Sequence, residues 1–225
     1  MNEAARRELA DAVRRLVLEE LAKSGLAPGR RPPMLVPVGV SARHMHVTKE
    51  HMAVLFGPGS ELTVHRPLSQ PGQFAANEQV TLVGPKGTIE RVRILGPYRS
   101  RTQVELAPSD ARKLGISPPV RRSGDLAGTP GLTVIGPHGR LELAEGCIIA
   151  ERHIHMTPDD ARVYGVRDGQ KVKVRVNGER GGIMDHVTIR VRNDFRLELH
   201  IDTDEANGFG IRHGSLLAVI REEEG

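Results

Sequence analysis

From residue 34 onward, short apolar runs are separated by Gly-Pro turns. Residues 171–176 alternate strictly between charged side chains and valine, and residues 187–191 keep the same period of two. This period places successive side chains on opposite faces of a β-strand, so both segments are predicted to be half-buried strands. Residues 80–89 and 132–141 each contain two apolar runs around a Gly-Pro turn, which predicts two hairpins.

Three short helices are expected between the strands, at residues 49–56, 108–114 and 158–163. A Ser or Thr hydroxyl just before a helix accepts hydrogen bonds from the free amide groups of the first turn. The candidate caps are Thr48, Ser109 and Thr157. The sequence therefore predicts a mainly β body with small capping helices.

The segment before the linker at residues 27–33 follows the period of a helix instead. One apolar stripe is formed by Leu9, Val13, Leu16, Val17 and Leu21. Residues 27–33 contain three prolines and are predicted to be a linker, because proline interrupts a helix. An amphipathic helix on a linker is expected to dock on its own body, on a sister subunit or on another protein.

An internal repeat relates two parts of the body. Residues 40–48 read VSARHMHVT, and residues 149–157 read IAERHIHMT. The repeated motif and the matching hairpins predict two related barrels, each contributing one arm to a shared site.

Each copy of the repeat contains an Arg-His-x-His unit. Residues i and i+2 of a strand share a face, so His44 pairs with His46, and His153 pairs with His155. Imidazole nitrogen suits Zn²⁺, and Fe, Cu or Ni less selectively. The alternative is a pair of surface strands with fortuitous histidines.

Two histidines are too few ligands for a zinc site. His200 alternates out of an apolar strand and could complete one site, although a core histidine is the other interpretation. Glu105 is an acid within a basic segment and could complete the other site.

The basic segment, residues 91–122, holds eight Arg or Lys residues and two acids in a chain of net charge +4. It is either a solvated face or a site for a polyanionic small molecule, because Arg forks bind phosphate bidentately. Four Phe, two Tyr and no Trp leave few rings on which bases could stack, so a nucleic-acid surface is disfavoured.

Cys147 is the one cysteine in the 225 residues, which excludes an internal disulfide and fits a reducing compartment. Its neighbours Ile148 and Ile149 predict a buried thiol. The chain contains neither 18 consecutive apolar residues nor the apolar core of a secretory signal, so a cytoplasmic protein is expected.

Longer motifs resemble one known family over residues 34 to 220. They are Ser41–His46, Leu68–Ala76, Ile94–Pro97 followed by Arg99, Gln103–Glu105, Arg122–Gly124, Arg152–His155 and His200–Asn207. The family is that of the phosphate propanoyltransferases, phosphotransacylases of the propanediol-utilisation type found in bacterial microcompartments.

The resemblance implies an enzyme that interconverts acyl-CoA plus phosphate with acyl phosphate plus CoA, with acetyl-CoA and propanoyl-CoA both open as substrates. It also implies a mainly β fold of two β-barrels capped by short helices. Barrel 1 would combine residues 34–42 with 151–221, and barrel 2 would take residues 43–150. Residues 1–33 would form the separate helix and linker.

The resemblance further implies two zinc ions, although other divalent metals could substitute. The zinc beside the CoA sulfur would be held by His44, His46 and Glu105, and the second zinc by His153, His155 and His200. Arg99 would bind phosphate. Contacts to CoA are expected from Ser41, Arg66, Arg93, Leu95 and Asn207. Residues 207–211 are richer in glycine than the family pattern, so a CoA-facing loop is expected to differ there.

Phosphate is a poor nucleophile towards a thioester, and both substrates are anionic. A metal with open positions can orient phosphate and neutralise its charge, and Arg99 can clamp it. We therefore predict direct attack of metal-bound phosphate on the acyl carbon. The alternatives are a zinc hydrolase of thioesters and a non-catalytic protein that binds anions or nucleic acid.

Microcompartment enzymes often carry a terminal helix as an encapsulation peptide. Residues 1–30 are therefore expected to bind shell or cargo proteins of a bacterial microcompartment. A homo-oligomer, either a dimer or a larger assembly, is also expected.

Overall fold

The structure is a computed structural model that describes residues 34–220. Within this range the chain is mainly β and contains four short helices, which confirms the predicted fold class. The predicted N-terminal helix and linker lie outside the described residues. No helix among the described residues is long and apolar enough to cross a membrane.

Six strands close into a barrel. Its strand order is β1 (Met34–Ser41), β14 (Glu198–Asp202), β11 (His153–Met156), β13 (Gly182–Val191), β12 (Lys171–Val176) and β15 (Leu216–Ile220). The two segments with a period of two are thus confirmed as strands. Val38, Ile154, Ile189 and Leu199 are fully or almost fully buried here. Each such side chain contributes about 1.5–3 kcal/mol when it leaves water.

The other nine strands form an open half-barrel. The order is β7 (Val120–Arg121), β10 (Cys147–Ala150), β6 (Gln103–Glu105), β2 (His44–His46), β5 (Thr88–Gly96), β4 (Phe74–Val83), β8 (Leu132–Ile135) and β9 (Arg140–Leu143), with β3 (Val64–Pro67) paired to β4. Its core joins Met45 and Ile94 of the sheet to Leu55 of α2 (Lys49–Phe56) and Leu114 of α3 (Pro108–Leu114).

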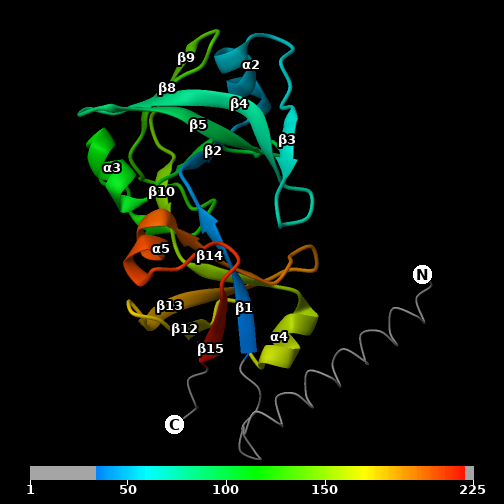
Figure 1. Cartoon of the computed structure of the whole chain (residues 1–225). Coiled ribbons are helices and arrows are strands. Elements are labelled where there is room, and N and C mark those ends of the chain that lie inside the picture. The colour runs from blue at the N-terminus through cyan, green and yellow to red at the C-terminus, as the bar shows by residue number, and fades with distance from the viewer. Residues whose placement is uncertain (1–33, 221–225) are drawn as a thin grey trace, which may run out of the picture. The chain divides into compact units, whose positions relative to one another are not determined.

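The strand before each His-x-His unit belongs to the opposite sheet from that unit. In Figure 1 the blue strand β1 lies beside β14 in the closed barrel, and the chain then crosses to β2 in the half-barrel. β10 pairs with β6 in the half-barrel, and the chain crosses back to β11. The two crossovers bring both His-x-His units to the region where the sheets face each other.

Two of the three predicted helix caps are confirmed. Thr48 caps α2 by accepting from the amide of His51, and Thr157 forms a capping box with Asp160 at the start of α4 (Pro158–Tyr164). The cap at Ser109 is wrong, because α3 begins at Pro108 and its N-cap is Ala107. Ser109 instead donates through Oγ and its amide to the carboxylate of Asp204, at 2.7 Å each.

Both Gly-Pro hairpin turns pack against the end of a helix. A Cβ atom on Gly84 would lie 2.3 Å from the carbonyl oxygen of Leu114, and one on Gly136 would lie 2.3 Å from that of Leu55. Side chains cannot approach so closely, so glycine is required at both turns. The repeated Gly-Pro motif therefore fastens the β4–β5 and β8–β9 hairpins to α3 and α2.

Candidate functional site

The first candidate metal centre lies where β2 and β6 pair. His44 is directly opposite Glu105 in this antiparallel pair. Nδ1 of His44 lies 2.9 Å from the carbonyl oxygen of Ala42, and Nδ1 of His46 lies 3.1 Å from that of Leu95. These hydrogen bonds turn Nε2 of the two rings towards Glu105, at 3.5 Å and 3.8 Å.

The second candidate centre is the same arrangement in the other half of the repeat. His153 of β11 is directly opposite His200 of β14. Nδ1 of His153 lies 2.7 Å from the carbonyl oxygen of Glu151, as His44 does with Ala42. His155 completes the group, and its ring centroid lies 4.5 Å from that of His200.

Burial holds the imidazoles of His46, His153, His155 and His200 in the neutral form that a metal ion requires. Burial, helped by neighbouring positive charge, lowers the pKa of His46 and of His153 to about 3. Burial also lowers the pKa of His155 and of His200. Because a neutral imidazole has a free lone pair, these rings can act as metal ligands at pH 7.

Glu105 is the one carboxylate in the two centres. Burial alone raises the pKa of its carboxyl, but His44, His46 and Arg99 outweigh this effect and lower the pKa to about 2. Ser123 adds a hydrogen bond from Oγ to Oε1 at 3.1 Å. The group is therefore ionised at neutral pH and can serve as an anionic ligand.

The residues fit a metal ion in each centre. The donor atoms of each group of three lie within 4.8 Å of one another. Both nitrogens of His155 are buried without a hydrogen-bond partner among the described residues, whereas Nε2 of His200 lies 3.2 Å from Oε2 of Glu198. Such unpaired nitrogens cost free energy unless they bind a ligand. Three His or Glu side chains with an open fourth position are typical of a catalytic zinc site.

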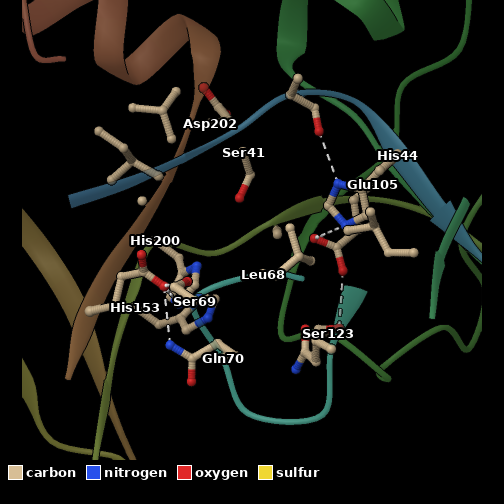
Figure 2. A pocket seen from close by; sticks show the side chains of 18 of the residues that line it. Ser41, His44, Leu68, Ser69, Gln70, Glu105, Ser123, His153, His200 and Asp202 are labelled. Carbon is tan, nitrogen blue, oxygen red and sulfur yellow. Dashed lines mark hydrogen bonds and ion pairs between the residues drawn. The ribbon is translucent and has the colours of Figure 1, made fainter. Parts of the chain in front are cut away.

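Both centres line a single cavity of about 540 Å³. Figure 2 shows His44 and Glu105 on one side of this cavity, His153 and His200 on the other side, and Leu68 between them. A ligand in the cavity can therefore contact both centres at once.

Most of the predicted substrate residues also line this cavity. They are Ser41, Arg66, Arg93, Leu95 and Arg99. Asn207 does not: it is exposed on α5 (Thr203–Phe209) and is not among the lining residues. His213, which belongs to neither candidate centre, also lines the cavity.

Arg99 and Arg190 supply half-buried positive charge beside the centres. Nη1 of Arg99 donates to Oγ of Ser123 at 2.9 Å, and burial lowers the pKa of this guanidinium. Burial also lowers the pKa of Arg190, whose Nε is buried without a hydrogen-bond partner in the described structure. Two guanidinium groups with unused donors are suited to hold a small oxyanion.

Arg190 is a site residue that the internal repeat does not indicate, because its equivalent in the other half is Leu95. β13 runs parallel to β11 as β5 runs parallel to β2, and this register places Arg190 beside His155. In the sequence, the strand around Arg190 shows only an alternating pattern.

Comparison with known proteins identifies the family. Residues 37–212 match the family model of phosphate propanoyltransferase. A phosphate propanoyltransferase of Thermotoga maritima is 56% identical over 192 residues, covering 85% of this chain and 91% of the relative. A phosphate propanoyltransferase of Rhodobacter capsulatus is 51% identical over 203 residues, covering 90% of this chain and 94% of the relative. The chain therefore belongs to the phosphate propanoyltransferase family and is a phosphate acyltransferase.

Proposed function

We propose that the protein transfers an acetyl or propanoyl group between CoA and phosphate at two zinc ions. His44, His46 and Glu105 would hold one ion, and His153, His155 and His200 would hold the other. The observation that carries the proposal is that both groups of three, together with Arg99 and Arg190, line one cavity. Bound zinc supplies Lewis acidity and charge neutralisation for anionic reactants, and other divalent ions can use the same ligands.

In this proposal Arg99 binds and orients phosphate. Ser123 accepts from Arg99 and donates to Glu105, so it fixes the guanidinium relative to the first centre. Gln103 donates through Nε2 to the same Ser123 oxygen at 2.9 Å, which further limits the movement of the Ser123 side chain. A planar guanidinium fixed in this way can present two parallel N–H groups to a phosphate, and it compensates the charge of the nucleophile.

Phosphate attacks the acyl carbon directly. A phosphate oxygen forms the new bond to carbon, the carbon–sulfur bond breaks, and its electron pair leaves with the CoA sulfur. The protein needs no nucleophile of its own for this step. Cys147 is fully buried and is not among the cavity-lining residues, and burial raises the pKa of its thiol to about 12.

CoA binds at the side of the cavity that carries Ser41, Arg66 and Arg93. The guanidinium of Arg93 donates to the carbonyl oxygen of Ala76, which fixes its position on β5. Arginine side chains there offer positive charge to the CoA phosphates. Leu95 gives an apolar contact, and Asn207 contributes only if the segment at the end of α5 folds over the bound cofactor.

We also propose that residues 34–42 with 151–221, and residues 43–150, are two domains, the closed barrel and the half-barrel, that work as one enzyme in a homo-oligomer. Residues 1–30 would bind shell or cargo proteins and place the enzyme in a bacterial microcompartment. The helical pattern of this segment supports the proposal. Deleting residues 1–30 is expected to preserve catalysis and abolish loading. Loss of both would indicate a structural role.

The decisive experiment measures CoA release from acetyl-CoA and propanoyl-CoA, with and without phosphate, on protein assayed for zinc. Release that requires both phosphate and zinc is expected. Release without phosphate would instead identify a thioester hydrolase, and no release from zinc-loaded protein would refute the proposal for these two acyl groups.

A further inference from the structure

A second cavity, of about 390 Å³, adjoins the one that holds both centres. The two cavities share six lining residues: His46, Gln73, Arg99, Ser123, His155 and Arg190. This shared set includes one histidine of each candidate centre and the half-buried Arg99 and Arg190. The two cavities therefore meet at the place where the reaction is proposed to occur.

The outer ends of the two cavities lie among different exposed residues. The first is lined at its exposed end by Arg43, Arg66 and His213. The second is lined there by Pro71, Gly72, Pro97, Arg192 and Asp194. Each cavity therefore reaches solvent beside its own set of residues.

The segment between β3 and β4, residues 68–73, separates the two openings. Leu68, Ser69 and Gln70 line the first cavity, and Pro71 and Gly72 line the second. Figure 2 shows Ser69 and Gln70 beside His153 and His200. This segment is thus a wall that belongs to the half-barrel and reaches the closed barrel.

The wall is fastened to the closed barrel at several points. Gln70 is 3% exposed; its Nε2 donates to the carbonyl oxygen of Arg196 at 3.0 Å, and its Oε1 accepts from the amide of Arg196 at 3.1 Å. Ser69 Oγ and Gln70 Nε2 both donate to the buried carboxylate of Glu198. A buried amide satisfied on both sides holds the segment as a fixed partition.

The second cavity carries the charge of a passage for small anions. Three arginines, Arg99, Arg190 and Arg192, face one acid, Asp194. Asp194 pairs with Arg192, at 2.9 Å from Nε and 2.6 Å from Nη2. The half-buried Arg99 and Arg190 keep positive charge at the inner end, whereas the charge of Arg192 at the exposed end is compensated by Asp194. Charge arranged in this way raises the local concentration of anions.

We propose that this second cavity is a separate entrance for phosphate and an exit for acyl phosphate, while CoA occupies the first cavity. The inference rests on the proposed function. It requires that phosphate reach the site while acyl-CoA is bound, so both substrates are present together before reaction. It also lets acyl phosphate leave before CoA.

Selective obstruction of each opening tests the proposal. Cys147 is buried, so a cysteine introduced at an exposed position is the only accessible thiol among the described residues. Arg192→Cys places it at the second opening and Arg66→Cys places it at the first. Arg140→Cys is the matched control, because Arg140 is exposed, pairs with an acid two residues on as Arg192 does, and lines neither cavity.

Each variant is assayed before and after alkylation with a bulky maleimide. Alkylated Arg192→Cys is expected to lose about tenfold or more in kcat/KM for phosphate, and to bind CoA with an unchanged Kd. Alkylated Arg66→Cys is expected to lose CoA affinity. Arg140→Cys should change in neither respect.

Two results would overturn the proposed entrance. One is an alkylated Arg192→Cys that uses phosphate as well as the unlabelled variant does. The other is an equal loss of phosphate use and CoA binding, which would mean that both substrates share one opening. Failure of the proposed function itself is distinguishable, because the unmodified protein would then show no phosphate-dependent CoA release.

Discussion

Glu105 and His200 occupy equivalent positions in the two halves of the internal repeat. Glu105 lies opposite His44 in the β2–β6 pair, and His200 lies opposite His153 in the β11–β14 pair. The same register therefore puts a carboxylate in one centre and an imidazole in the other. Since a carboxylate adds a negative charge and an oxygen donor, the two centres differ in the metal chemistry that they favour.

Removing a ligand from one centre should leave the other centre loaded. We expect Glu105→Gln and His200→Gln each to lower the zinc content from about two ions per chain to about one, because each centre has its own three ligands. Elemental analysis of the purified protein measures this. His65→Gln, a change at an exposed histidine outside both groups, should leave the content unchanged. Loss of both ions in Glu105→Gln would show that the centres are not independent.

Replacing Arg99 should impair the use of phosphate far more than the binding of CoA. Arg99→Lys keeps the charge but loses the planar fork, so kcat/KM for phosphate is expected to fall by about tenfold to a hundredfold. Arg99→Ala should lower kcat/KM for phosphate further, because it also removes the charge. Steady-state kinetics and CoA titration separate the two effects, and equal losses in both would remove Arg99 from the phosphate site.

Phe195 should determine the metal affinity of the second centre alone. Its ring stacks on His155 at a centroid distance of 3.8 Å, and His155 has no hydrogen bond to orient it among the described residues. In the other half of the repeat, a hydrogen bond to the Leu95 carbonyl orients His46.

We expect Phe195→Leu to weaken binding of one zinc by about tenfold, as loss of an outer-shell contact typically does. Competition with a chelator measures this, and Phe195→Tyr, which keeps the ring, should restore the affinity. Unchanged binding of both ions in Phe195→Leu would contradict the role.

Metal-free protein should lose stability in acid between pH 6.5 and about 3. The pKa of His46 and of His153 is about 3 in the folded chain, against 6.5 as the ordinary value. Below pH 6.5 the unfolded chain therefore takes up protons that the folded chain does not. Within this window the free energy of unfolding decreases as the pH is lowered. Above pH 6.5 these two groups do not affect it.

Urea unfolding of the metal-free protein at pH 7.5 and pH 5.5 tests this expectation. The difference should be about 1 kcal/mol for each of the two histidines. His46→Gln should reduce this difference in the free energy of unfolding by about 1 kcal/mol, the contribution of one histidine. A pH dependence identical in His46→Gln and the unsubstituted protein would refute the assignment.

Cys147 should be chemically inert and dispensable for the reaction. Its pKa of about 12 and complete burial leave almost no accessible thiolate. We expect iodoacetamide to leave the native protein unlabelled at pH 8, as mass spectrometry would detect, and Cys147→Ala to retain phosphate-dependent CoA release. Rapid labelling with loss of activity would point to an acyl-cysteine intermediate instead.

The sequence by itself determined the features that depend on neighbouring residues. A period of two identified β12 and part of β13, and it placed His44 with His46 on one face. The repeat pointed to two related halves and to a second histidine pair. Side-chain alternation along a strand is local, so these inferences needed no knowledge of which strands pair.

Local sequence patterns do not show where a residue distant in sequence determines the hydrogen bonds or the exposure of a side chain. The sequence predicts Ser109 as a helix cap, but the helix begins one residue earlier, at Pro108. The Ser109 hydroxyl instead donates a hydrogen bond to the carboxylate of Asp204 in α5. Asn207 belongs to a motif whose first three residues line the cavity, while its own side chain is exposed on α5, so its contact with CoA stays a prediction.

Only the tertiary structure decided the composition of each centre and the form of the cavities. The exchange of β1 and β10 between the sheets brings His44 and His153, which are far apart in sequence, to one cavity. The register of β13 on β11 places Arg190 beside His155. Gln70 fastens the segment between the two cavities to the closed barrel. Such contacts depend on long-range strand pairing, whose register is set by the whole buried face of each strand and not by the residues next to it in sequence.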